Sequence, residues 1–410
     1  MVIILSCLAI CMSGIGHFLL MRKEGGIATF GTLFFAAYLT AAVLFGAGFE
    51  YQSGGFLWLS LALLFWTIGA TVGASIKVVR FSDARLSMQS AVLSPPNWFL
   101  FVLCIIGAFQ VFAALSASGF SVANFLLNSL VAASERYSGT ASNSNLAKLS
   151  LIAVYTASIL AGLKAGNPLV KKKWLLLLFP ILIAAALGLS QNAKATVLYS
   201  LALWGGGFLT VSQMVGRTVF GPRKVIAFLI AVVLVGVLFF FMQWLRYGGQ
   251  VGGVELTNIL SVYAFAQISA FSIWYEVAPS IELGLGTETF RSIVGAFIGT
   301  SDIQGYERFI AQVSDNYSTT VITGYAELIK DFGRVGSLGV VFILGLLTAQ
   351  ISRNLTRCVR GSCGLACLVY ASIIFFPITS LLNYTTLLLS FVLVGLLDLA
   401  SRHKHIDISQ

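Results

Sequence analysis

Charged residues are scarce in this chain. Only 10% of its 410 residues are Asp, Glu, Lys or Arg, whereas 58% are hydrophobic and the mean hydropathy is +0.92. A soluble globular domain carries about 25% charged residues, so the composition excludes an ordinary soluble protein. Repeated apolar runs of about 20 residues are long enough to cross a bilayer as helices. The sequence therefore predicts an all-α, polytopic membrane protein.

Histidine and the common catalytic motifs are also scarce or absent. The chain has three histidines, His17, His403 and His405, and none lies in a segment that we expect outside the cytoplasm. It contains no Walker, HExxH or GxSxG motif and no cluster of metal ligands. The six cysteines are interpreted as small apolar residues. We therefore expect neither a metal nor a cofactor.

The distribution of basic residues predicts the topology. The net charge is +10, but the Lys and Arg residues are scattered in short connections, which argues against nucleic-acid binding. Of the 25 basic residues, 17 fall in alternate connections and the C-terminal tail, as the positive-inside rule expects for cytoplasmic segments. The N-terminus is therefore predicted outside and the C-terminus in the cytoplasm. The eleven predicted spans are 2–21, 27–48, 55–76, 97–116, 147–163, 173–190, 195–213, 224–245, 335–352, 364–382 and 384–400.

One long segment interrupts this pattern within a single membrane domain, 1–410. Residues 246–334 contain nine of the fifteen acidic residues and are predicted to form a large outer loop. An apolar stretch in it, 258–275, predicts an amphipathic or re-entrant helix, with a twelfth span as the alternative. Positions 260, 263, 264, 267, 271 and 274 share one face of that helix. A second short helix, 287–298, places Glu288 and Arg291 on one face.

Basic side chains in the outer segments are candidates for binding phosphate. Arg136, Arg246 and Arg291 come from separate outer segments, and arginine grips phosphate with a rigid fork of donors. Lys194 lies in a tight connection between two spans, at the outer mouth. The alternatives are an interfacial anchor for Arg246 and snorkelling to lipid headgroups for Lys194.

Two carboxylates near the end of the loop are candidates for a general base. Glu327 and Asp331 are four residues apart and share a helical face, so their repulsion could favour a protonated form of one of them. Lys330 and Arg334 are interleaved with them, and an ordinary ionic network is the alternative.

The end of the loop also carries the motifs of a known family. The segment Asp-Asn-Tyr-Ser-Thr at 315–319 precedes Asp-Phe-Gly-Arg-Val-Gly at 331–336, which enters a Gly- and Leu-rich span. In these motifs and in its many spans with one large late loop, the chain resembles the O-antigen (Wzy-type) oligosaccharide repeat-unit polymerases. The resemblance implies a polytopic, GT-C-like glycosyltransferase in the bacterial inner membrane.

The resemblance also implies substrates and roles. A growing glycan would pass from undecaprenyl diphosphate to a new lipid-linked repeat at the periplasmic face, with no metal or nucleotide sugar. The outer basic residues would bind the diphosphate, and Glu327 or Asp331 would deprotonate the acceptor hydroxyl. Four residues would line the sugar site: Tyr137, Asn316, Tyr317 and Tyr325.

Other functions remain open at this stage. A flippase or transporter of a lipid-linked glycan is one alternative, although such proteins often have repeated halves and polar sites at mid-membrane, and no internal repeat is evident. An O-antigen ligase is a second, disfavoured because no outer histidine is present. A structural membrane protein with a surface loop is a third. The expected partners are the lipid bilayer and the lipid-linked oligosaccharide, and a chain-length regulator protein remains open.

Overall fold

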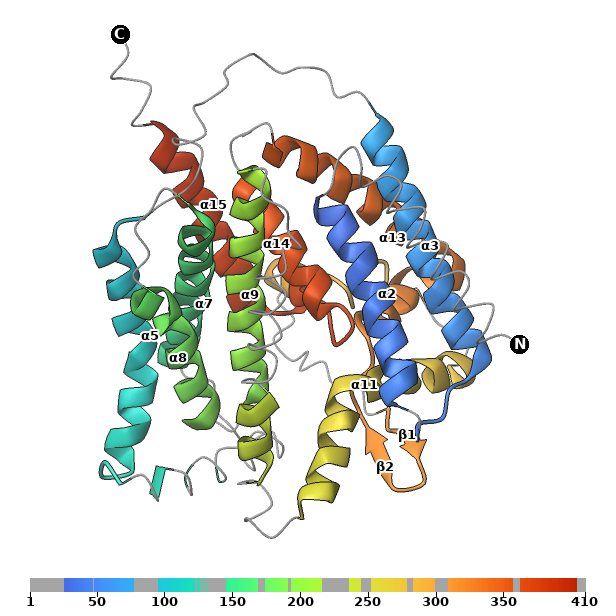
Figure 1. The fold of residues 1–410 in the computed structure, drawn as a ribbon, viewed down its shortest axis with the longest axis horizontal. Coiled ribbons are helices and arrows are strands. Elements are labelled where there is room, and N and C mark those ends of the chain that lie inside the picture. The colour runs from blue at the N-terminus through green and yellow to red at the C-terminus, as the bar shows by residue number, and fades with distance from the viewer. Residues whose placement is uncertain are drawn as a thin grey trace. The chain divides into compact units, whose positions relative to one another are not determined.

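The described part of the chain is almost entirely α-helical, with one small antiparallel sheet (Figure 1). The computed structural model describes residues 26–46, 48–76, 95–121, 124–125, 128, 131, 145–168, 174–190, 193–215, 236–244, 252–278, 283–298, 309–356 and 362–403. The α-helices are α2 (Ile27–Phe45), α3 (Ser53–Ser75), α5 (Asn97–Ala117), α7 (Asn145–Gly166), α8 (Trp174–Ser190), α9 (Lys194–Met214), α11 (Gly253–Val277), α12 (Arg291–Ile298), α13 (Gly324–Thr356), α14 (Ser362–Phe375) and α15 (Thr385–His403). The strands are β1 (Ala311–Ser314) and β2 (Tyr317–Thr319), and a 3-10 helix, η1, covers Leu381–Asn383.

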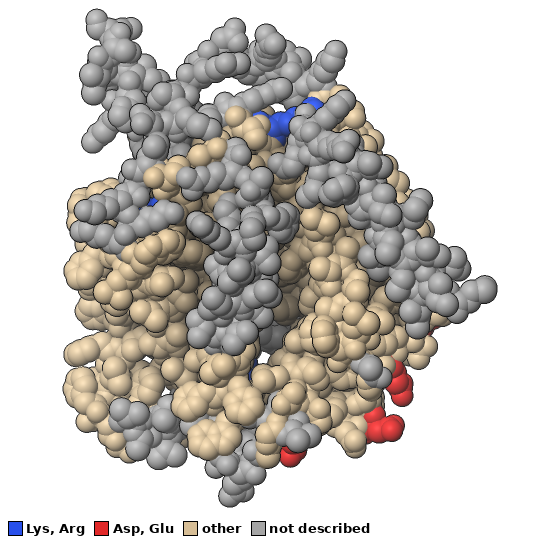
Figure 2. Space-filling model, in the orientation of Figure 1, with Lys and Arg blue, Asp and Glu red and all other residues tan. Residues whose placement is uncertain are grey.

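Six of the helices in the described part are long and apolar enough to cross a membrane. They are α2, α3, α5, α7, α9 and α13, and the helices α8, α14 and α15 are apolar but shorter. Large apolar side chains are exposed along them, and among the described residues that Figure 2 shows, charged side chains are few and lie near the top and bottom of the view. Exposed apolar surface of this extent is expected where lipid replaces water. The expectation of a helical membrane protein is thus confirmed.

Nine of the eleven predicted spans coincide with described helices, and two bounds were wrong. Span 2–21 and most of span 224–245 lie outside the described residues. The span predicted at 335–352 belongs to a longer helix that begins at Gly324. The span predicted at 364–382 is too long, because α14 ends at Phe375 and Pro377, which has no backbone N–H, lies two residues later.

The chain divides into two compact units. The first comprises 1–84, 258–354 and 372–385, and the second comprises 85–257, 355–371 and 386–410. In the first unit, α3 and α13 approach closely through Gly69 and Gly345, where an added Cβ would collide with the backbone of the facing helix. In the second unit, α7 and α9 meet in the same way, and a Cβ on Gly207 would lie 2.6 Å from the carbonyl oxygen of Ile159. Small residues allow such backbone contact between membrane helices.

Helix α11 occupies the stretch where an amphipathic or re-entrant helix was predicted. Of the positions that share the predicted face, Gln267, Phe271 and Trp274 are buried, whereas Tyr263 is 40% exposed. Residues 266–272 are all buried, because neighbouring elements of the first unit pack around this half of the helix. Burial in this half of α11 is therefore set by the neighbouring elements and is not limited to the one helical face that the sequence pattern indicates.

Candidate functional site

Helix α13 is broken at Gly333, and the candidate site lies on the N-terminal side of this break. An unbroken helix of 33 residues would be about 50 Å long, which exceeds the ~30 Å hydrocarbon core. Gly333 has φ 72° and ψ 172°, in a region that residues with a Cβ rarely adopt. The break separates a short polar helix, 324–332, from the long apolar section that follows.

Asp331, just before the break, holds the backbone of a distant segment. Its Oδ1 accepts a hydrogen bond from the amide of Glu288 at 3.0 Å, and its Oδ2 accepts one from the amide of Thr289 at 2.6 Å. The side chain of Asp331 has no exposed surface. Both carboxylate oxygens are thus engaged at the turn that leads into α12.

Glu327 lies one helical turn before Asp331 and faces different partners. Its Oε1 accepts a hydrogen bond of 3.2 Å from the hydroxyl of Thr379. Asn383 and the backbone of Ser380 also lie at this carboxylate. Its Oε2 is buried, and within the described residues no donor reaches it with hydrogen-bond geometry. Glu327 is therefore a buried carboxylate with one oxygen still able to accept a proton.

Arg291 brings a positive charge to the same place. It is the first residue of α12, which packs beside η1. Its Nη2 donates to Glu288, so the predicted pair of these two residues is present, and its charge also acts on Glu327. The side chain of Arg291 is 13% exposed, and its Nε is buried without an acceptor among the described residues. Three segments of the chain therefore meet around one carboxylate and one guanidinium.

Several buried polar atoms in this region lack a hydrogen-bond partner within the described part of the chain. They are Thr289 Oγ1, Arg291 Nε, Thr323 Oγ1, Glu327 Oε2 and Asn383 Oδ1. Buried polar groups in folded proteins are nearly always paired, and exceptions of this kind point to water or a ligand. We call the group formed by Glu288, Thr289, Arg291, Thr323, Glu327, Asp331, Thr379 and Asn383 the polar cluster.

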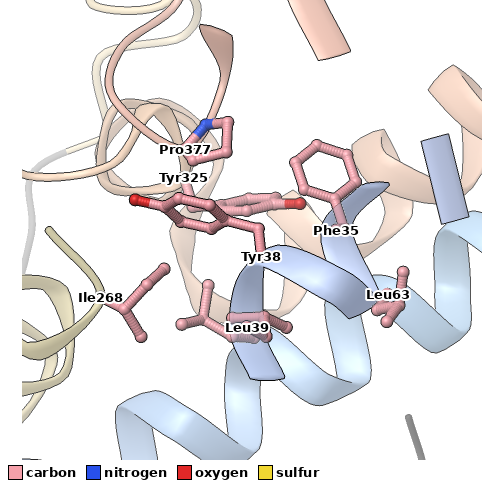
Figure 3. A pocket seen from close by; sticks show the side chains of 8 residues that line it. Phe35, Tyr38, Leu39, Leu63, Ile268, Tyr325 and Pro377 are labelled. Atoms are coloured by element: carbon pink, nitrogen blue, oxygen red, sulfur yellow. The ribbon is translucent and has the colours of Figure 1, made fainter. Parts of the chain in front are cut away.

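Tyr325 lies between these groups in sequence but belongs to an aromatic core. Its ring is 4.7 Å from that of Phe376 and also contacts the rings of Phe35, Trp58 and Phe271. It lines a small pocket together with Phe35, Tyr38, Leu39, Leu59, Leu63, Ile268 and Pro377 (Figure 3). This pocket is mainly apolar and has room for about one water molecule, so it does not accommodate a sugar ring.

The other residues expected at the sugar site are dispersed. Asn316 is exposed at the turn between β1 and β2. Tyr317 is partly buried and packs on the hydrophobic cluster that joins the hairpin to α11. Tyr137 lies outside the described residues. The described parts of the predicted sugar site thus lie on the hairpin and in the aromatic core.

Of the basic residues expected to bind diphosphate, Arg291 is the one described in the first unit. Lys194 begins α9 in the second unit, with its Nζ buried. Arg136 and Arg246 lie outside the described residues. The binding of a diphosphate by these residues therefore stays a prediction.

The alternative of an ionic network around the two carboxylates does not hold for Arg334. Its guanidinium donates to the carbonyl oxygen of Tyr275 at 2.7 Å and lies 4.3 Å from the centre of the Tyr275 ring. Among the described residues it forms no ion pair with Glu327 or Asp331. Arg334 thus completes the C-terminal turn of α11, where a positive charge is favourable.

No protein-family model, curated protein or solved structure matches this chain. Within the described ranges, no three His, Cys, Asp or Glu side chains come together as a possible metal site. The chemistry that the cluster itself offers is proton transfer at Glu327 and stabilisation of negative charge at Arg291. These two functions suit the transfer of a group from a phosphate ester to a hydroxyl.

Proposed function

We propose that the protein is a membrane glycosyltransferase that polymerises lipid-linked oligosaccharide repeat units, with undecaprenyl diphosphate as the lipid carrier. The polar cluster is the observation that carries the proposal. In a chain with only 10% charged residues, it gathers a carboxylate, a guanidinium and unpartnered polar atoms at one buried place. Buried ionisable groups in membrane proteins are expensive to maintain and usually serve function. The sequence motifs shared with the Wzy-type polymerases add the substrate class.

The proposed reaction assigns one role to each charged group. The acceptor hydroxyl oxygen attacks the anomeric carbon of the growing glycan, and its proton passes to Glu327. The bond from that carbon to the diphosphate oxygen breaks, and undecaprenyl diphosphate leaves with the negative charge. Arg291 stabilises this charge. Charge-assisted hydrogen bonds of this kind contribute about 1.5–3 kcal/mol each.

The proposed location is the bacterial inner membrane, with the 246–334 loop in the periplasm. The charge distribution along α3 supports this orientation. At its N-terminal end, Glu276 accepts a hydrogen bond from the amide of Gly54 at 2.9 Å. At its C-terminal end, Arg353 donates to the carbonyl oxygen of Ile76 at 2.6 Å. Basic residues concentrate on the cytoplasmic side of membrane proteins, which supports an orientation with Arg353 inside and the loop outside.

The test is extension of lipid-linked repeats by the purified full chain in detergent. The wild-type protein is expected to give a ladder of longer glycans on the lipid carrier. Glu327→Gln, which keeps the side-chain size, is expected to leave single repeats. Glu255→Gln serves as the matched control, because Glu255 is exposed at the start of α11.

Two outcomes would contradict the proposal. A flippase moves its substrate across a membrane and would form no longer glycan in detergent. A ligase would form product only when a lipid A acceptor is supplied. Wild-type protein that extends no repeat would contradict the polymerase function. Normal extension by Glu327→Gln would show that Glu327 is not the base.

A further inference from the structure

Asp331 uses its carboxylate to hold backbone rather than to face the unpartnered atoms of the polar cluster. Each of its oxygens already accepts a backbone hydrogen bond, from Glu288 and Thr289. Protonation would remove the negative charge that strengthens both hydrogen bonds, and a proton on the lone pair that either amide uses would break that contact. Asp331 is therefore poorly suited to be a base, in contrast to Glu327, whose Oε2 lacks a donor in the described part of the chain.

The backbone on both sides of Asp331 completes the attachment. The amide of Gly284 donates to the carbonyl oxygen of Lys330, and the amide of Leu285 donates to that of Asp331, each at 3.1 Å. In an unbroken helix these two carbonyls would accept from the amides four residues later. The break at Gly333 makes them available to another segment. We call residues 283–290 the docked segment.

The geometry of the docked segment is specific to this attachment. Leu285 has a positive φ of 50°, which a residue with a Cβ keeps only where the surroundings enforce it, and the next residue, Gly286, has a φ of 99° that glycine adopts readily. A Cβ on Gly284 would lie 2.5 Å from Oδ1 of Asp331, so the segment lies directly against the carboxylate. The amide of Phe290 donates to the carbonyl of Gly286, and α12 begins at the next residue, Arg291.

We propose that Asp331 is a positioning residue: by holding the docked segment on the break of α13, it fixes Arg291 beside Glu327. Four hydrogen bonds join the two segments, and Arg291 follows the docked segment without an intervening residue. Releasing the segment would move the guanidinium away from the carboxylate. The roles of Arg291 and Glu327 in this inference rest on the proposed function, whereas the attachment itself does not.

Amide hydrogen exchange of the full chain in detergent tests the attachment without any substrate. In Asp331→Asn, one of the two amides loses its acceptor, because the amide group of Asn supplies only one oxygen. Exchange in the docked segment is expected to accelerate by about 10- to 100-fold, as for the loss of a charge-assisted hydrogen bond. Asp315→Asn is the matched control, since Asp315 is exposed at the hairpin turn.

A second variant disturbs the contact between Asp331 and the docked segment by changing the docked segment. Gly284→Ala leaves Asp331 intact but places a methyl group against its Oδ1. It is expected to accelerate exchange in the same segment, and it decides the question if Asp331→Asn does not fold. Exchange of residues 284–290 that stays at the wild-type rate in the folded variants would overturn the proposal.

Activity then separates positioning from base catalysis. If Asp331 acts through Arg291, the double variant Asp331→Asn with Arg291→Lys is expected to be no slower than the slower single variant. The pH profile of Asp331→Asn is expected to keep the wild-type acid limb, because the proposed base, Glu327, is unchanged in this variant. Independent, multiplying losses or a lost acid limb in Asp331→Asn would assign Asp331 to the chemistry instead. Failure of the polymerase assay alone leaves the exchange result valid, so the two proposals fail separately.

Discussion

The indole nitrogen of Trp58 donates a hydrogen bond of 2.8 Å to the carbonyl oxygen of Arg334, the residue directly after the break in α13. This contact fixes the start of the long apolar section against α3. On the other side of the break, Asp331 holds the docked segment. Hydrogen bonds therefore hold the chain on both sides of the break, so the backbone conformation at Gly333 is fixed by its neighbours.

Replacing Gly333 by alanine is expected to destabilise the protein by about 1–3 kcal/mol, because a backbone with φ 72° and ψ 172° is strained for a residue with a Cβ. Space is not the cause, since the nearest atom to the new Cβ would be Cδ2 of Leu283 at 3.5 Å. Thermal unfolding in detergent measures the effect. The control, Gly339→Ala, meets nothing within 4 Å inside the same helix and is expected to stabilise it by about 0.5–1 kcal/mol. Equal shifts in the two variants would contradict this account.

Arg291→Lys is expected to lower glycan extension by about 10- to 100-fold while the amount of folded protein stays the same. Lysine keeps the charge but loses the fork of donors that can reach Glu288 and a phosphate together. The chain-length distribution of the product and the quantity of folded protein are measured side by side. Arg353→Lys is the control, because Arg353 contacts the carbonyl of Ile76 at the C-terminal end of α3 and is not part of the polar cluster. Full activity of Arg291→Lys would remove Arg291 from the site.

Gly207→Ala is expected to destabilise the second unit, whereas Gly205→Ala in the same helix is not. A Cβ on Gly207 would lie 2.6 Å from the carbonyl oxygen of Ile159, so α7 and α9 would have to move apart. A Cβ on Gly205 meets nothing within 4 Å. Overpacking of this kind typically lowers the free energy of unfolding by about 1–3 kcal/mol. A change of this size is measurable as a shift in the unfolding midpoint. Similar midpoints for the two variants would show that the helices are not in contact there.

Tyr325→Ala is expected to reduce stability by about 3 kcal/mol or more, because it empties the centre of the aromatic core. Tyr325→Phe keeps the ring and its four aromatic neighbours, and it is expected to retain most of the stability. If Tyr325 also served the sugar site through its hydroxyl, Tyr325→Phe would lose activity at unchanged stability. Unfolding and glycan extension measured on both variants distinguish the two roles.

The sequence alone was sufficient for most of the helices and for part of the site. Apolar runs located α3 and α9 to within two residues, because hydrophobicity decides which segments enter a membrane. The scarcity of charge directed attention to Glu327, Asp331 and Arg291. The different roles of the two carboxylates were not predictable, since they depend on segments that only the fold brings together.

The uncharged members of the polar cluster gave no signal in the sequence. Thr379 follows α14 in a stretch that was predicted to continue as a span to residue 382, and Asn383 was the single residue expected between that span and the next. Their side chains matter because the chain turns back there and meets the short helix before the break. Periodicity cannot reveal such a turn when most of the surrounding residues are apolar. Pro377 was the available signal, because proline cannot continue the hydrogen-bond pattern of α14.

The turn after α14 also sets an order of events during synthesis. The amide of Gly324 donates to the carbonyl oxygen of Phe376 at 3.0 Å, and Glu327 accepts from Thr379. When α13 has entered the bilayer, a nascent chain still lacks Phe376 and Thr379, because the ribosome has not yet synthesised them. Chains cut short before residue 376 would therefore insert most of their helices and yet never assemble the carboxylate's surroundings.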